Sequence, residues 1–163
     1  MTLVEEIDDW VQALNARYRD KRHSCEDFAG VLSGFYSRAF LQNAGFVVVD
    51  QLPLPDSPQL RASGVLTSLT SHDIVGITFD DTYYVLRGHE HEVQLHFHEL
   101  VHVAQWRALG RLGFIARYLQ ELSRYGYSRQ APLEKMAYDA QEHYANGEAA
   151  FDVVQNVQSL LSG

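Results

Sequence analysis

Two histidines and a glutamate with the spacing of a metal site stand together in the segment HFHELVHVAQW, residues 96–106. His98 and His102 are four residues apart, so on an α-helix both side chains project from the same face and can reach one ion. Glu99 follows the first histidine directly, where its carboxylate can take a proton from a metal-activated water. The His-Glu-x-x-His pattern therefore predicts a zinc site that needs no serine or cysteine nucleophile.

The alternative interpretation of this segment is an amphipathic core helix that carries two incidental histidines. A helix from about Glu92 to Leu109, ended by Gly110, contains enough apolar residues for either interpretation. The motif favours the metal site, because a chance match is expected in well under about one chain of this length in a hundred.

A zinc ion held by two histidines needs a third protein ligand. Gln105 and Ala108 occupy the positions at which a metzincin has glycine and a further histidine, so that family is not indicated. Glu134 is the candidate, because it follows Pro132 at the expected start of a helix. Ala137 would share its face and allow two helices to approach closely. The alternative is an ordinary first-turn glutamate, which the helix dipole favours.

With HExxHxxQ at residues 98–105 and Pro-Leu-Glu-x-x-Ala-Tyr at residues 132–138, the chain resembles the zincin metallopeptidases whose third ligand is a glutamate. In particular, it resembles small bacterial zincin-like domains, some of which accompany contractile injection systems, over roughly residues 74–144. The resemblance implies a zincin-like fold and zinc-dependent hydrolysis but no known substrate. The roles that it implies are zinc ligation by His98, His102 and Glu134, and general-base catalysis by Glu99.

Three positions around this predicted site are open to more than one interpretation. Thermolysin-like members have an aspartate four residues after the ligand glutamate to brace a zinc histidine, whereas here Tyr138 stands there, beside Asp139. Gln105 can hydrogen-bond near the metal or pack against the next helix. Tyr127, in the loop before the Glu134 helix, is our candidate donor to the oxyanion of a tetrahedral intermediate.

The composition limits the classes of protein to which the chain can belong. Its 163 residues, 46% hydrophobic and 12% aromatic, fit one domain with a substantial core and exclude a disordered or fibrous protein. The formal net charge of −8 opposes binding to nucleic acids or anionic membranes. Cys25, the only cysteine, is expected to be a buried apolar side chain. The acidic N-terminus does not resemble a signal peptide, so we expect a cytoplasmic protein.

The hydrophobic pattern predicts an α+β fold, mostly helical, with a small sheet containing a β-hairpin beside the HExxH helix. We expect a single domain over residues 1–163, in which helices (1–45) precede strands and a loop (46–87), then the metal-site and C-terminal helices (88–163). The individual elements expected are helices near 2–18, 24–43, 92–109, 114–122, 132–144 and 150–161, and strands at 46–49, 74–79 and 82–86.

Other histidines and the hairpin leave further alternatives. His89 and His91 could form a second metal cluster or be exposed polar residues before the helix, and His96 is expected to point away from the site. His143 could approach the site from the Glu134 helix. The hairpin can pair with an extended substrate or be purely structural.

These observations together favour a zinc-dependent peptidase that acts on a peptide or protein substrate. The first alternative is a zinc-stabilised, non-catalytic binding or assembly module, and the second is a helical interaction protein without metal. We expect neither a nucleic acid nor a membrane as partner, and the sequence does not indicate an oligomeric state.

Overall fold

Helices make up most of the chain in the computed structural model, which describes residues 1–162. Together with a four-stranded mixed sheet they form an α+β fold, as predicted. The elements in chain order are α1 (Leu3–Arg17), η1 (Arg19–Lys21), β1 (His23–Ser24), η2 (Cys25–Phe28), α2 (Arg38–Gln42), β2 (Gly45–Val49), α3 (Pro58–Ser63), α4 (Thr67–Thr70), β3 (Gly76–Phe79), β4 (Thr82–Leu86), α5 (Val93–Leu109), α6 (Arg111–Tyr125), α7 (Pro132–Ala145) and α8 (Val153–Ser162).

The sheet has the strand order β1-β2-β4-β3, so β3 is an edge strand. Strands β3 and β4 form the predicted antiparallel hairpin, in which Asp80 adopts a positive φ of 63° in the connecting turn. The predicted strand at 46–49 corresponds to β2, which pairs with β4 in parallel and places Val47 opposite Tyr84. The edge position of β3 matters for the site, because α5 packs beside this strand.

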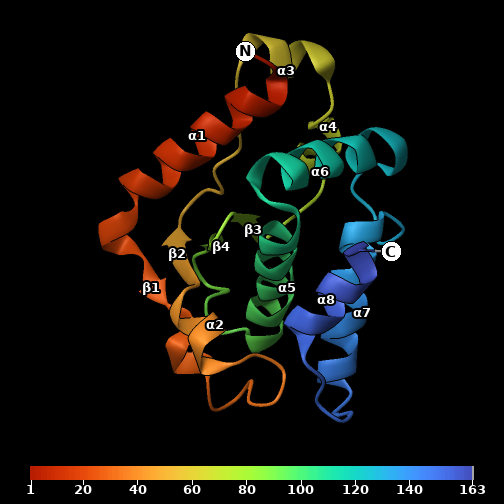
Figure 1. Ribbon diagram of the computed structural model, residues 1–163. Helices are drawn as coiled ribbons and strands as arrows, with labels where there is room; N and C mark the ends of the chain where they lie inside the picture. The colour runs from red at the N-terminus through yellow and green to blue at the C-terminus, as the bar shows by residue number, and fades with distance from the viewer. Residues whose placement is uncertain (163) are drawn as a thin grey trace.

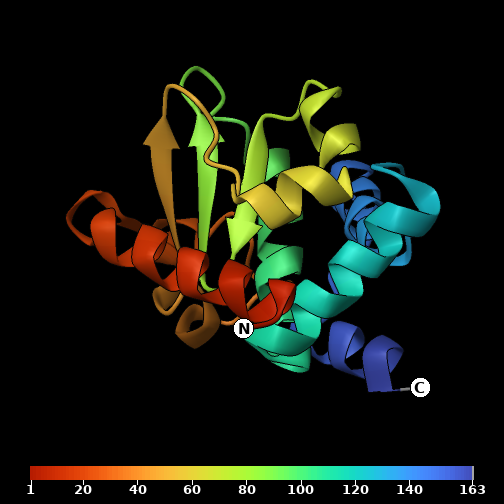
Figure 2. The same cartoon turned by 90° about the horizontal axis from the view of Figure 1, so that it is seen from above.

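The two faces of the sheet are covered by different helices. In both Figure 1 and Figure 2 the sheet lies between α1 and α5. Because side chains alternate along a strand, Val47 and Tyr84 pack with the apolar face of α1, whereas Tyr83 and Val85 pack with α5. The sheet therefore separates two apolar cores.

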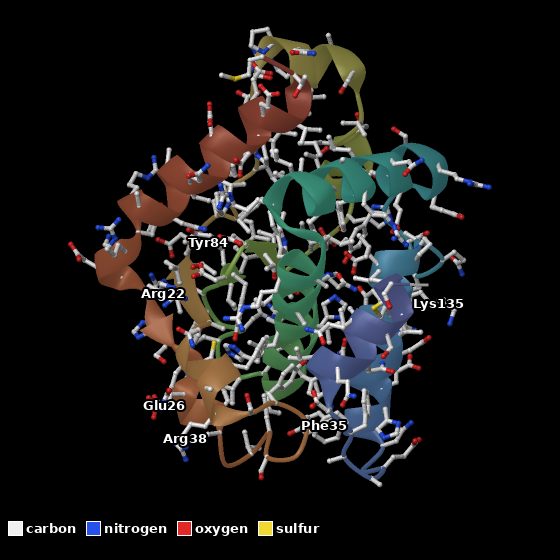
Figure 3. All side chains as sticks on the ribbon, in the orientation of Figure 1. Arg22, Glu26, Phe35, Arg38, Tyr84 and Lys135 are labelled. Carbon is white, nitrogen blue, oxygen red and sulfur yellow. The ribbon has the colours of Figure 1, made fainter. Side chains whose placement is uncertain are left out.

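Polar side chains fix α1 and the following turn against the hairpin. The Tyr84 hydroxyl, at the α1 side of the sheet (Figure 3), donates to Asn15 Oδ1 at 2.6 Å, and Asn15 Nδ2 donates to the Phe79 carbonyl at 2.9 Å. Arg22, also labelled in Figure 3, donates from Nε to Thr82 Oγ1 at 2.9 Å. These bonds hold the start of β4 to the N-terminal segment.

Helix α5 is the central element of the fold. Every residue from His96 to Trp106 is buried, because the sheet, α6, α7 and α8 all contact this helix. A helix enclosed in this way has no solvated face, so each of its polar side chains must find a partner inside the protein.

The predicted helix at 24–43 is wrong, because the segment contains only η2, a series of turns and the short α2. Gly34 interrupts the helix with a φ of 86°, and a Cβ at this position would lie 2.9 Å from the Ala150 Cβ. Ser37 then caps a new helix, since its side chain accepts from the Phe40 N–H.

Within residues 1–162 no helix is both long and apolar enough to cross a membrane.

Candidate metal centre

The two histidines of the HExxH motif lie one above the other on α5. His98 and His102 are 5% and 4% exposed, and their Nε2 atoms are 3.2 Å apart. Both Nε2 atoms point toward α7, as the spacing of four residues on a helix predicts.

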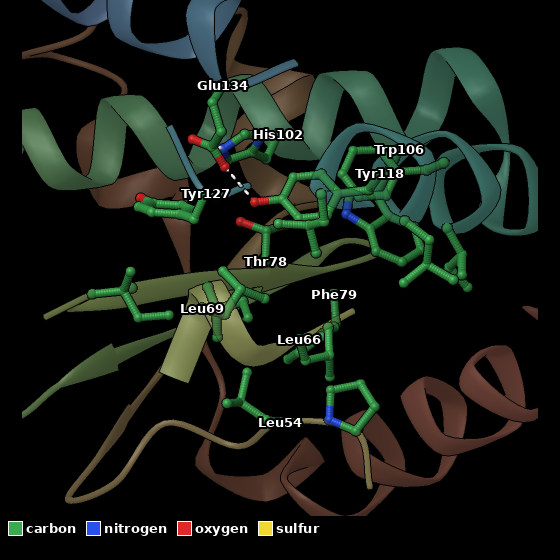
Figure 4. Close-up of a pocket in the computed structure, with 18 of the residues that line it drawn as sticks. Leu54, Leu66, Leu69, Thr78, Phe79, His102, Trp106, Tyr118, Tyr127 and Glu134 are labelled. Atoms are coloured by element: carbon green, nitrogen blue, oxygen red, sulfur yellow. Dashed lines mark hydrogen bonds and ion pairs between the residues drawn. The ribbon is translucent and has the colours of Figure 1, made fainter. Parts of the chain in front are cut away.

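Glu134 reaches the same point from α7. Its Oε1 lies 3.2 Å from His98 Nε2 and 3.3 Å from His102 Nε2, and Figure 4 shows Glu134 beside His102. Ala137, fully buried between the helices, permits their close approach. These three side chains, which we call the metal triad, form the one group of histidine, cysteine or carboxylate ligands within residues 1–162 that can hold a metal ion.

Two residues of α6 hold Glu134 in place, one through the backbone of α7 and one through the carboxylate. The buried Glu121 of α6 accepts the backbone N–H of Leu133 at 2.8 Å, and this bond caps the first turn of α7. The Tyr118 hydroxyl donates to Glu134 Oε2 at 2.6 Å, which leaves Oε1 free to face the histidines. Glu121 and Tyr118 were not predicted, because only the packing of α6 against α7 brings them to the site.

Two glutamines determine which nitrogen of each histidine carries its proton. Gln105 Nε2 donates to the Leu133 carbonyl at 3.0 Å, so its Oε1 must face His102 Nδ1, 2.8 Å away. Since Oε1 can only accept, Nδ1 of His102 carries a proton, so Nε2 is the nitrogen that can offer a lone pair to a metal. Gln141 Oε1 lies 3.0 Å from His98 Nδ1 and accepts from it.

The role of Gln105, left open by the sequence, is therefore both hydrogen bonding and helix packing. Gln141, which sequence reasoning missed, lies seven residues after Glu134, two turns along the same face of α7. Asp139 does not brace the site, because it is exposed and pairs with Lys135 at 2.6 Å. Tyr138 packs its ring against the His98 imidazole, with centroids 4.5 Å apart.

The charges of the triad are strongly coupled. Burial by itself lowers the pKa of His102, but the Glu134 carboxylate outweighs it and raises that pKa to about 9. Burial acts to raise the pKa of Glu134, but His102 and His98 hold it well below its usual range. The site therefore contains an ionised carboxylate that attracts a cation.

Glu99 lies beside the triad without joining it. Its Oε2 is 3.9 Å from His98 Nε2, and its Oε1 accepts a hydrogen bond of 3.0 Å from the Thr78 hydroxyl of β3. Burial raises the pKa of Glu99, the two histidines lower it, and Glu134 adds to the rise, with a net upward shift. Gly76 lets β3 approach, because a Cβ there would be 3.2 Å from the Glu99 carboxyl carbon.

Tyr127 lies at the wall of the same cavity as Glu99 and Glu134 (Figure 4). Its hydroxyl is 3.1 Å from that of Tyr138. Burial, and then the Glu134 carboxylate, raise the pKa of Tyr127, so the hydroxyl keeps its proton. Its backbone N–H donates to Ser68 Oγ, which connects this loop to α4.

The other histidines considered in the sequence analysis lie outside the metal triad. His96 is fully buried and bonded through both ring nitrogens, whereas His89 is exposed and pairs with Glu92. His91 is almost fully exposed, and with His89 it forms no second metal group within the described residues. His143 points away from the triad, since it bonds the Ala149 carbonyl and the Glu148 carboxylate.

An open groove of about 740 Å³ leads from the surface to His98 and Glu99. One wall consists of residues 73–76, which lead into edge strand β3, and the other includes Tyr138 and Gln141 of α7. A ligand in this groove can therefore reach Glu99 and the triad from solvent.

Comparison with models of known protein families gives no match, and neither the curated proteins nor the solved structures yield a significant similarity. The geometry of the site is therefore what indicates a function.

Proposed function

We propose that the protein is a zinc-dependent peptidase of minimal zincin type. The observation that carries the proposal is the convergence of three ligand atoms in the metal triad. His98 Nε2, His102 Nε2 and Glu134 Oε1 lie 3.2–3.3 Å from one another. In the metal-free protein a proton on His102 Nε2, whose pKa is raised to about 9, can bridge to Glu134. A metal cation would take the place of this proton and engage all three atoms at once, which a single proton cannot do.

The size of this triangle and the kind of ligands favour zinc. Zinc binds imidazole nitrogen and carboxylate oxygen at about 2.0–2.2 Å, so two ligand atoms of a tetrahedral site are about 3.3–3.6 Å apart. An octahedral magnesium site would bring neighbouring ligands closer, and magnesium prefers oxygen ligands. Two imidazoles with one carboxylate are also the ligand set of catalytic zinc sites that keep a fourth position open.

The position of Glu99 supports its role as general base. A bound zinc ion lowers the pKa of water and polarises a carbonyl group. Glu99 can accept the proton of the attacking water and return it to the leaving amine, because its carboxylate lies next to the triad but is not part of it. The upward shift brings the pKa of Glu99 closer to neutral pH, at which the carboxylate both accepts and returns a proton efficiently.

Tyr127 is the proposed donor to the developing oxyanion. It keeps its hydroxyl proton, as a donor must, and it lines both the groove and the cavity at the triad. Tyr138, hydrogen-bonded to it, holds this hydroxyl in position.

Edge strand β3 supports a peptide as the substrate. An extended peptide in the groove can pair with the backbone leading into β3, because an edge strand has one side without a neighbouring strand. Pairing of this kind gives affinity through the main chain and requires little of the substrate's side chains.

The test compares wild type with Glu99→Gln and with Glu92→Gln, a matched change of another carboxylate lining the groove. We expect all three proteins to bind about one zinc per chain by elemental analysis. Hydrolysis of a peptide library is then measured by mass spectrometry. The rate of hydrolysis should fall about 10²- to 10⁴-fold in Glu99→Gln and stay at the wild-type level in Glu92→Gln.

Two outcomes would contradict the proposal in different ways. Full turnover by Glu99→Gln would remove the assigned mechanism. One zinc per chain without hydrolysis of any peptide by wild type would favour the zinc-stabilised, non-catalytic module instead.

A further inference from the structure

The cavity lined by Glu99, Tyr127 and the metal triad adjoins the groove, and most of its remaining lining is apolar. It is bounded by β3, by the end of α5, by α6 and by the segment that includes α3 and α4. Figure 4 shows this pocket with Glu134 and His102 at one end. Its aromatic side is formed by Trp106, Phe114 and Tyr118, whose rings are stacked in sequence with centroids 4.3 and 5.5 Å apart.

Trp106 places an unpaired hydrogen-bond donor in this apolar lining. The side chain is 2% exposed, and among residues 1–162 no atom accepts from its indole N–H. Trp106 lines the pocket, and Figure 4 draws its indole nitrogen beside the Tyr118 ring. A buried donor without a partner is costly, so this N–H indicates that a bound group supplies the acceptor.

We propose that this pocket binds a tyrosine side chain of the substrate, next to the scissile bond, with its hydroxyl oxygen accepting from the Trp106 N–H. The proposal rests on the peptidase function proposed above and adds a preference for one amino acid.

The dimensions of the pocket agree with one aromatic side chain. It has a volume of about 80 Å³, well above the roughly 10–15 Å³ that a single water needs, so a group of several heavy atoms fits. Trp106 follows His102 by one helical turn, about 6 Å along α5. A ring that enters beside the triad therefore reaches the indole with its far end.

The chemistry of the lining distinguishes tyrosine from phenylalanine and from the charged residues. Stacked aromatic rings favour an aromatic guest. Phenylalanine has no acceptor for the indole N–H, and lysine and arginine carry only donors. Aspartate and glutamate would have to bury a charge among apolar side chains, which is unfavourable. Tyrosine combines an aromatic body with a terminal oxygen that accepts.

The experiment measures binding of uncleavable ligands to the zinc-loaded protein by calorimetry. The probes are acetohydroxamate, which contains the chelating group alone, and two succinyl hydroxamates that differ only in a benzyl or a 4-hydroxybenzyl group. Wild type should bind the 4-hydroxybenzyl compound about tenfold more tightly than the benzyl compound. Trp106→Phe, which keeps a ring but removes the donor, should reduce this ratio to about one.

Trp10→Phe is the matched control, because Trp10 is the other tryptophan of the chain and does not line the pocket. It should keep the tenfold ratio, and it also leaves Trp106 as the only tryptophan, whose fluorescence should change when the 4-hydroxybenzyl compound binds. In the peptide library, cleavage by wild type should be enriched at tyrosine on one side of the scissile bond.

The outcomes separate this proposal from the one on which it rests. If acetohydroxamate binds but the two substituted compounds bind equally, or if Trp106→Phe keeps the ratio, the tyrosine pocket is wrong and the metal site stands. If acetohydroxamate does not bind, the metal site itself is wrong and both proposals fall. A tenfold ratio without any peptide hydrolysis would retain the pocket and overturn the peptidase.

Discussion

Helix α5 carries two buried histidine clusters that differ in how their hydrogen bonds are completed. The first, which we call the closed cluster, consists of His96, Tyr83 and Cys25, together with the Glu90 carbonyl. The second is the metal triad, only two residues further along the same helix. Both clusters are buried and contain imidazole, so neither burial nor residue type separates them.

The closed cluster is complete without a ligand. The Glu90 carbonyl can only accept, so His96 donates from Nε2 at 2.8 Å, and its Nδ1 then accepts from the Tyr83 hydroxyl at 2.6 Å. The oxygen of Tyr83 can accept in turn from the Cys25 thiol, 3.4 Å away. Burial lowers the pKa of His96 and so favours the neutral ring that this arrangement needs.

The metal triad cannot be completed in this way. Each of its histidines donates from Nδ1 to a glutamine, and both remaining nitrogens face the single Glu134 Oε1, so one proton cannot bridge all three atoms. A ligand histidine is thus recognised by an Nε2 that faces other ligand atoms while its Nδ1 already has an acceptor. Substitutions in the two clusters should therefore have different consequences.

The largest difference is expected between His102→Ala and His96→Ala. His102→Ala removes a ligand and should reduce bound zinc from about one per chain to near zero, with loss of hydrolysis. His96→Ala should retain the zinc but lower the free energy of unfolding by about 2–4 kcal/mol, because it leaves a cavity and two groups without partners. Elemental analysis and urea denaturation measure the two effects.

If His96→Ala does not fold, His96→Gln provides the same comparison with a smaller cavity. Zinc retained by His102→Ala, or lost from a folded His96 variant, would contradict the distinction between the clusters.

A smaller effect is expected from the glutamines that orient the triad. Gln105→Leu and Gln141→Leu should each weaken zinc binding by about 10- to 100-fold, because the partners of ligand histidines fix the tautomer and the direction of the ring. Gln105→Leu should be the more severe, since it also leaves the Leu133 carbonyl without its donor. Competition with a chromophoric chelator measures the affinities.

Gln94→Leu is the control for these variants, because Gln94 is an exposed residue of α5 that also lines the groove. Equal affinities for all three variants and wild type would mean that the glutamines do not orient the ligands.

These residues also mark the limit of what the sequence predicts. The HExxH spacing acts within one helix, so His98, His102 and the position of Glu99 follow from local geometry. Glu134 was predicted as their partner mainly because such a site needs a third ligand, and the structure brings it to the two histidines. Gln141, Tyr118 and Thr78 reach the site through tertiary packing, for which no local pattern exists.

The fold shows the same limit. The hairpin, β2, α1 and the helices from α5 onward follow from apolar periodicity and capping residues, and they were predicted with nearly correct bounds. The segment 24–43 has apolar residues at helical spacing but folds into turns. Gly34 is the reason, because its positive φ allows the close approach of Ala150, a contact made by a residue more than a hundred positions away.

The smallest effect concerns the closed cluster and appears at alkaline pH. Burial raises the pKa of the Cys25 thiol from 9.0 to about 11, against smaller lowering effects of Tyr83 and Arg22. Between these two values the unfolded chain has lost the thiol proton while the folded protein keeps it, so rising pH favours unfolding. From pH 8 to pH 10 this should cost about 1 kcal/mol of stability.

Cys25→Ser isolates this contribution, because a serine hydroxyl can still donate to Tyr83 but does not titrate in this range. Urea denaturation of both proteins at pH 8 and pH 10 should show a loss in wild type that exceeds the loss in Cys25→Ser by about 1 kcal/mol. Other titrating groups cancel in this difference. An equal loss in both would mean that the thiol is not held protonated by the closed cluster, whose completeness would then depend on Tyr83 and His96 alone.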